Sequence, residues 1–265
     1  MVVKIGDINV WISRYYSGDM TAYVFMIIAL IILGVVLQFK VGDKNFNKIF
    51  IFASVCWFVL ELVLQLTGMR AWYSPPTIFG YPIDVPWTAF LQGPVEGGMP
   101  TTLGYLCAKV FYEKKYYWFL ACMGMSIFFS FLFIFGFDFA AMSPLTVSHR
   151  VLSIWGIVFI VSTTILALIL SVRYFEDRKF PYLVFIFMAI LGVMINIVMY
   201  FAGLRNIEYA IPFNYGETPT IFFPYPFGIA LLVLLYDGIF EFAGIYLFIF
   251  IVGVKLFNMD LLEKK

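Results

Sequence analysis

Long runs of hydrophobic residues, separated by short polar stretches, make up most of this chain. Each run is about 20 residues long, the length of helix that crosses the ~30 Å hydrocarbon core of a bilayer. Backbone in lipid must satisfy its own hydrogen bonds, so we predict that the runs are transmembrane helices. We expect seven of them, at residues 22–40, 49–67, 88–111, 116–136, 151–172, 182–203 and 226–254.

Composition supports this prediction. Hydrophobic residues are 63% of the chain and charged residues 12%, against roughly 45–50% and about 25% in soluble domains. We therefore expect an all-α, polytopic protein of the cell membrane, a multi-pass chain with one domain over residues 1–265. Residues 1–21 contain acids and no long apolar run, so we expect a short interfacial helix there and no cleavable signal peptide. Residues 255–265 form the expected C-terminal tail.

Lysine and arginine predict the orientation, because cytoplasmic loops carry an excess of them. Twelve of the 17 fall on the side that holds the short connections 41–47 and 113–115. We therefore predict an outer N-terminus and a cytoplasmic C-terminus. The remaining five, on the expected outer side, are Lys4, Arg14, Arg70, Arg150 and Arg205. The net charge of +1, with no basic stripe, predicts no nucleic-acid partner.

Two stretches of the chain resemble each other. Residues 61–70 (ELVLQLTGMR) and 196–205 (NIVMYFAGLR) both end in Gly-x-Arg, and each is followed by a Tyr-Pro. The hydrophobic segment that comes next contains Gly-x-x-Glu in both cases, ending at Glu96 and at Glu241. The two units are four helices apart, and an even offset preserves direction. We therefore expect a parallel 3+1+3 pseudo-repeat, with the fourth helix as connector.

Four carboxylates, those of Glu61, Glu96, Asp237 and Glu241, lie inside predicted helices. Ionisable groups are costly in hydrocarbon and are therefore candidates for function. At 1.5 Å per residue, Glu61 and Glu96 lie about 13 Å from the outer helix ends, and Asp237 is at a similar depth. The predicted helices offer no Lys, Arg or His to neutralise this layer. We therefore expect at least one of the acids to carry a proton at neutral pH.

Polar neighbours share the helix faces of these acids. Gln65 is four residues from Glu61, and Gln92 is four residues from Glu96, so each pair lies on one face. Glycines and prolines around Glu96 predict a kink in the third helix. The candidate catalytic residues are Glu61, Glu96 and Asp237, and the candidate substrate-binding residues are Trp57, Gln65, Gln92, Asn196, Tyr236 and Glu241. Alternatively, these groups bind one another and only hold helices together.

Several chemistries are disfavoured. His149 is the only histidine and is predicted in a loop, so a histidine metal centre is not expected. An aspartate-rich motif that would hold Mg²⁺ on a diphosphate is missing, and so are glycine-rich nucleotide loops. We predict no metal and no cofactor, which leaves carboxylate chemistry or transport.

Two short motifs resemble those of the fungal integral-membrane terpene cyclases of meroterpenoid and indole-diterpene biosynthesis. They are Cys56-Trp57-Phe-Val-Leu-Glu61 and Tyr236-Asp237-Gly238. The resemblance implies seven helices and two acids that protonate an epoxide and steer polyene cyclisation. The chain departs from that family in the spacing of Trp57 and Glu61, which are adjacent there, and in its additional acids, Glu96 and Glu241.

A looser likeness, to carotenoid hydratases, rests on Glu61, Thr67-Gly68 and Val85-Pro86-Trp87. The leading hypothesis is therefore a membrane enzyme that acts on an apolar isoprenoid or similar lipid by carboxylate-driven cyclisation, hydration or isomerisation. The alternative is a proton-coupled transporter with a carboxylate-lined site at the repeat interface. A receptor or a subunit of a larger complex is a third possibility, which seven helices do not exclude.

Overall fold

The computed structural model describes residues 4–5, 8–16, 20–72, 75–135, 146–151, 154–201, 205–209, 222–223, 231 and 235–261. This part of the chain is mostly helical, as predicted. The α-helices are α1 (Thr21–Val36), α2 (Asn45–Leu66), α3 (Val85–Gln92), α4 (Met99–Tyr112), α5 (Tyr116–Phe135), α6 (Ile154–Tyr174), α7 (Lys179–Phe201) and α9 (Ile245–Leu256). Three π-helical segments continue them, at η1 (Leu37–Val41), η2 (Gly93–Gly98) and η3 (Tyr236–Gly244).

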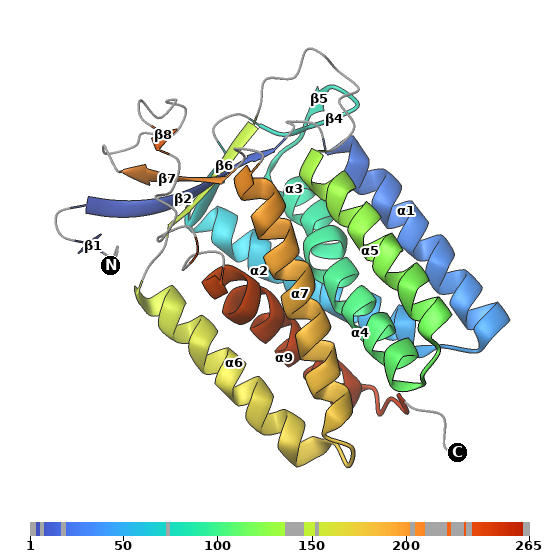
Figure 1. The fold of residues 1–265 in the computed structure, drawn as a ribbon. Coiled ribbons are helices and arrows are strands. Elements are labelled where there is room, and N and C mark those ends of the chain that lie inside the picture. The colour runs from blue at the N-terminus through green and yellow to red at the C-terminus, as the bar shows by residue number, and fades with distance from the viewer. Residues whose placement is uncertain are drawn as a thin grey trace.

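Each predicted apolar segment contains helix, and the helices pack side by side in a bundle (Figure 1). Within the described ranges, five helical stretches are long and apolar enough to cross a membrane: Thr21–Val41, Asn45–Leu66, Gly156–Tyr174, Lys179–Phe201 and Tyr236–Leu256. The start of the last predicted segment, residues 226–230, lies outside the described residues.

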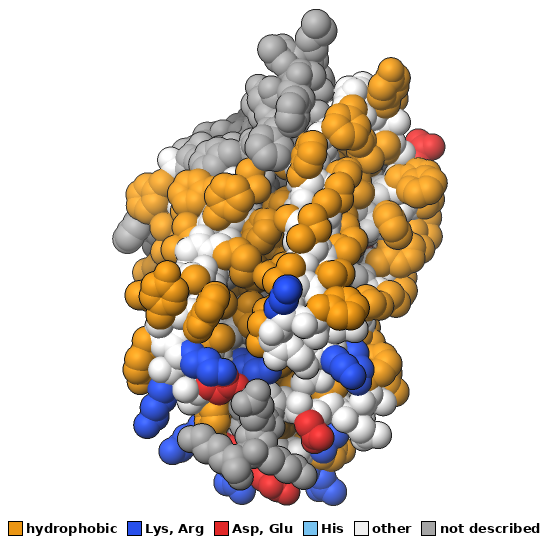
Figure 2. Space-filling model, turned by 90° about the vertical axis from the view of Figure 1, so that its right-hand side faces the viewer, with side chains coloured by type: hydrophobic (Ala, Val, Ile, Leu, Met, Phe, Trp, Pro, Cys, Tyr) orange, Lys and Arg blue, Asp and Glu red, His pale blue; other side chains and the backbone are white. Residues whose placement is uncertain are grey.

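The bundle is apolar on its outside as well as in its core. Ile51, Leu120 and Phe159 are each more than 60% exposed, and Figure 2 shows a broad apolar surface on the face formed by α1 and α5. Large apolar patches on a soluble monomer are unusual and mark contact with a partner or a membrane. By contrast, the acids predicted within the helices are buried. This distribution agrees with a protein embedded in lipid.

A β-sheet lies at one end of the bundle, and the C-terminus lies at the other end (Figure 1). Its strands pair in the order β3-β6-β2-β7-β8, all antiparallel, and β1 pairs with β2. The strands are β1 (Lys4–Ile5), β2 (Ile8–Tyr16), β3 (Arg70–Trp72), β6 (Thr146–Val151), β7 (Arg205–Tyr209) and β8 (Phe222–Phe223). A separate hairpin pairs β4 (Thr77–Ile78) with β5 (Tyr81–Pro82).

The expected interfacial helix at the N-terminus is wrong, because the described part of that segment forms β1 and β2. The sequence of β2, INVWISRYY, is rich in β-branched and aromatic residues, which favour strands. Its backbone pairs with β6 on one side and β7 on the other. The strand therefore depends on partners that are more than 100 residues away in the sequence.

The π-helical segments η2 and η3 carry the repeated Gly-x-x-Glu units. At Gly97, a Cβ would lie 2.2 Å from the Cβ of Trp57 on α2, and at Gly238 it would lie 2.9 Å from the backbone nitrogen of Val193 on α7. Glycine thus lets η2 pack closely against α2 and η3 pack closely against α7. The predicted irregularity of the third helix is present as η2, a form frequent at functional sites. The π-helical segment η3 was not predicted.

Candidate functional site

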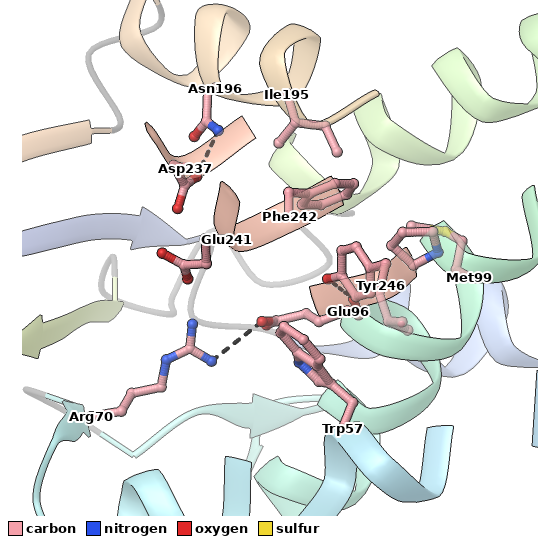
Figure 3. A pocket seen from close by; sticks show the side chains of 12 residues that line it. Trp57, Arg70, Glu96, Met99, Ile195, Asn196, Asp237, Glu241, Phe242 and Tyr246 are labelled. Atoms are coloured by element: carbon pink, nitrogen blue, oxygen red, sulfur yellow. Dashed lines mark hydrogen bonds and ion pairs between the residues drawn. The ribbon is translucent and has the colours of Figure 1, made fainter. Parts of the chain in front are cut away.

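The buried carboxylates surround a small cavity between α2 and η2 on one side and α7 and η3 on the other (Figure 3). The volume open to the centres of water molecules is about 40 Å³, enough for a few waters at roughly 10–15 Å³ each. Its lining residues are Trp57, Arg70, Val95, Glu96, Met99, Pro100, Ile195, Asn196, Asp237, Glu241, Phe242 and Tyr246. Both of the similar stretches, through Arg70 and Asn196, therefore contribute to one cavity.

Arg70 overturns the expectation of an acid layer without a cation. Its Nη1 lies 2.5 Å from Oε2 of Glu61 and 3.2 Å from Oε2 of Glu96, and all three side chains are buried. The sequence placed Arg70 in an outer connection, beyond the end of the second helix. Strand β3 instead holds its backbone at the sheet, from which the side chain reaches the two glutamates. One guanidinium thus contacts both Glu61 and Glu96.

Glu96 is held by contacts to both of its carboxylate oxygens. Oε1 accepts hydrogen bonds from Gln92 Nε2 at 2.9 Å and from the Tyr23 hydroxyl at 3.4 Å, and Oε2 accepts one from Arg70. The Tyr246 hydroxyl donates to the backbone carbonyl of Glu96. Since the arginine and amide groups can only donate here, Glu96 acts as an acceptor in this arrangement.

A line of amide hydrogen bonds connects Glu96 with the sheet end of the bundle. Thr88 Oγ1 donates to Gln65 Oε1 at 2.7 Å, and Gln65 Nε2 donates to Gln92 Oε1 at 2.6 Å. Gln92 in turn donates to Glu96. All four side chains are buried. Such a fully bonded network fixes each amide in one orientation, so Glu96 is set in place by its supports.

The second copy holds its acid differently. Asn196 Nδ2 on α7 donates to Asp237 Oδ2 on η3 at 2.6 Å and to the backbone carbonyl of Gly192 at 2.9 Å. Asp237 and Glu241 are four residues apart on η3 and both line the cavity. Arg70 thus contacts Glu61 and Glu96, whereas Asn196 contacts Asp237.

Nε1 of Trp57 and Oδ1 of Asn196, both on residues that line the cavity, have no hydrogen-bond partner among the described residues. The side chains are only 6% and 1% exposed, and leaving such groups unsatisfied costs about 1–3 kcal/mol each. One is a donor and the other an acceptor. Water, which both donates and accepts hydrogen bonds, would satisfy either atom.

The structure places the predicted site residues in three groups. Trp57, Glu96, Asn196, Asp237 and Glu241 line the cavity. Glu61 is one step behind it, through Arg70, and Gln65 and Gln92 support Glu96 from the sheet side. Tyr236 does not line the cavity, and its ring stacks on Phe240 with centroids 6.2 Å apart.

Sequence reasoning missed three contributors. Arg70 was counted only as an orientation charge, although its place in the repeated Gly-x-Arg was a usable signal. Tyr23 and Tyr246 come from the first and last helical segments, and nothing in their local sequence distinguishes them from other aromatics. Tyr246 also packs on Trp57, with ring centroids 4.9 Å apart.

Among the described residues, His, Cys, Asp and Glu side chains form no group of three arranged to hold a metal ion. Comparisons of the chain with family models, curated proteins and solved structures find no match.

Proposed function

We propose that this chain is an integral-membrane enzyme that protonates an alkene or epoxide of an apolar isoprenoid or similar lipid. The observation that carries this proposal is the cavity itself. Three acids, Trp57 and Asn196 line a water-sized space inside an apolar helix bundle. A site of low polarity that holds few waters strengthens the electrostatic effect of each polar group in it.

Asp237 or Glu241 is the proposed general acid. Glu61 and Glu96 share the guanidinium of Arg70. A third and fourth negative charge in the same buried region would repel both. A proton held between Asp237 and Glu241 removes part of that repulsion and is the proton available for transfer.

In the proposed reaction, the acid gives up one proton and later recovers one. The acid gives its proton to the alkene carbon or epoxide oxygen, and the resulting cationic carbon accepts a water oxygen or loses a neighbouring proton. The carboxylate left on Asp237 or Glu241 takes that last proton back. Trp57 and Tyr246 place aromatic faces beside this space, and such faces stabilise a nearby cation.

The size of the cavity favours hydration or isomerisation over the cyclisation implied by the resemblance to terpene cyclases. A folded polyene needs roughly 300–1,000 Å³, whereas the cavity offers about 40 Å³ to the centres of water molecules. Water fits as a reactant beside Trp57 Nε1 and Asn196 Oδ1. Only the reacting end of a lipid would then need to approach the acids.

We further infer that all seven apolar segments cross the membrane, with the N-terminus outside and the C-terminus in the cytoplasm. The sheet supports this, because its pairing requires β2, β3, β6 and β7 to lie on one side of the bundle. The five cations expected on the outer side all fall in the sheet strands. The parallel repeat is supported by two π-helical segments that each approach a neighbouring helix closely at a glycine. At Gly97 η2 approaches α2, and at Gly238 η3 approaches α7.

Lipid-extract mass spectrometry after expression in an isoprenoid-rich host tests the enzyme proposal. A product present with the wild type should be lost with Asp237→Asn or Glu241→Gln. Isolated membranes given the unlabelled lipid in heavy water should add one deuterium to the product where the proton goes to an alkene carbon. Glu176→Gln, an exposed acid in the connection between α6 and α7, is the matched control and should retain the product. Full product formation by both Asp237→Asn and Glu241→Gln would contradict the proposal.

A proton-coupled transporter remains the second candidate, because two related units each bring a carboxylate on a π-helical segment to a shared cavity. That arrangement is what parallel repeats around a central site would present. Uptake into proteoliposomes driven by a pH gradient, abolished by Asp237→Asn, would favour this function. An unchanged substrate pool in the lipid-extract experiment together with such uptake would replace the enzyme proposal.

A further inference from the structure

A second and larger hollow lies at the opposite end of the bundle, between α1, α4 and α5. On the same measure as the first cavity, its volume is about 820 Å³, within the usual size of a ligand site, roughly 300–1,000 Å³. It shares no lining residue with the carboxylate cavity. We refer to it as the lysine groove.

The upper wall of the lysine groove is apolar. It is formed by Leu33, Leu37, Leu106, Val110, Ala121 and Met125. From Val41 at the rim to Leu33, the wall follows the first helix for eight residues, about 12 Å at 1.5 Å per residue. A free soluble anion would gain nothing from these side chains.

The lower end of the groove is rimmed by charge. Lys44, Lys48, Lys109 and Lys115 line it together with Asp43, Glu113 and Asp260. Figure 2 looks onto this face and shows charged side chains gathered at its lower end, beneath the apolar surface. The hollow therefore changes from apolar to cationic along its length, which is the polarity of an anionic lipid.

Two of the lysines are already neutralised. Lys109 Nζ lies 2.8 Å from Asp43 Oδ2, and Lys115 Nζ lies 2.7 Å from Glu113 Oε2. Lys44 and Lys48 are exposed, and no ion pair to either occurs within the described residues. They are four residues apart at the start of α2, on one helix face. Asp260 also lines the rim and is exposed, with no ion pair among the described residues. The two lysines therefore leave the rim with a net positive charge for a ligand.

We propose that the lysine groove binds a bilayer phospholipid with a negatively charged headgroup. The phosphate lies between Lys44 and Lys48, and an acyl chain follows the apolar wall between α1 and α5. Basic pockets between transmembrane helices on the cytoplasmic side recognise anionic headgroups by this combination. The lipid would tie α1 to α5 at a site independent of the carboxylate cavity.

Native mass spectrometry of the full chain in detergent tests this, with phosphatidylglycerol and phosphatidylcholine as probes. The wild type should bind phosphatidylglycerol more tightly. The double variant Lys44→Gln/Lys48→Gln should weaken phosphatidylglycerol binding about fivefold per lysine, roughly 25-fold for the pair, with little effect on phosphatidylcholine. Ala121→Trp, which fills the apolar wall, should weaken binding of both lipids.

The matched control is Lys40→Gln/Lys114→Gln, which removes the same charge from exposed lysines of the same end that do not line the groove. It should leave phosphatidylglycerol binding within about twofold of wild type. Equal losses in the two double variants, equal affinity for the two lipids, or binding of inorganic phosphate with the same lysine dependence would each overturn the proposal.

Discussion

Replacement of Arg70 by methionine removes the cation that Glu61 and Glu96 share, and is expected to destabilise the protein strongly. Methionine keeps the length and apolar stem of the side chain but leaves two buried carboxylates without their ion pair. All three side chains are at most 5% exposed, so solvent does not screen the change. Breaking a buried pair by removing one partner costs about 3–5 kcal/mol.

That free energy corresponds to a fall in Tm of about 6–20 °C, at roughly 2–4 °C per kcal/mol for a chain of this size. The assay is thermal unfolding of the purified protein in detergent, followed by intrinsic fluorescence. Arg178→Met, at an exposed position of the connection between α6 and α7, is the matched control and should change stability by at most about 0.5 kcal/mol.

The triple variant Arg70→Met/Glu61→Gln/Glu96→Gln separates the loss of charge pairing from the loss of packing. It contains no unpaired carboxylate at the two positions, so it should recover most of the Tm lost in Arg70→Met. A single variant as stable as the wild type would refute the buried ion pairs. A triple variant no more stable than the single variant would show that the loss arises from packing.

The other predictions concern the close packing of η2 and the polar contact above the lysine groove. Gly97→Ala places a methyl group 2.2 Å from the Cβ of Trp57 and should cost about 1–3 kcal/mol by overpacking. Gly124→Ala, where a Cβ would meet nothing within 4 Å, should instead be neutral or stabilise α5 by up to about 1 kcal/mol. Tyr105→Phe removes the 3.1 Å hydrogen bond to Asp43 and should cost about 0.5–1.5 kcal/mol.

The same thermal unfolding assay measures these three variants. Equal stability of Gly97→Ala and Gly124→Ala would contradict the close approach of η2 to α2. Tyr117→Phe, at a tyrosine whose ring is 80% exposed, is the control for the loss of a hydroxyl. If Tyr105→Phe changes the Tm no more than Tyr117→Phe does, the hydrogen bond between Tyr105 and Asp43 does not stabilise the protein.

Local sequence was sufficient for the helices and for the selection of the acids. A run of about 20 apolar residues forms a helix in lipid, and ionisable groups within such a run are costly unless they are buried in the protein. Glu96, Asp237 and Glu241 were selected on this ground, and the structure places all three at one cavity. The irregular third helix followed from the glycines and prolines of η2 for the same local reason.

The strands and Arg70 required the tertiary structure. Strand β2 pairs with β6 and β7, and no feature of residues 8–16 records where those partners lie. Local sequence therefore predicts a helix for the N-terminal segment, which is wrong. Arg70 was taken for a loop charge, because only the position of β3 in the sheet directs its side chain toward Glu61 and Glu96. The volume of the cavity also depends on packing between helices that are distant in the sequence.

The sequence by itself determined the class of protein, the helices and the burial of four acids, because hydrophobic length and periodicity act through neighbouring residues. Only the tertiary structure decided which acids share a cation, that the polar side chains of Trp57 and Asn196 lie at one cavity, and where a lysine-rimmed groove opens. Those properties arise between segments that are distant in the chain. Their energies depend on separations of a few ångströms that no local pattern specifies.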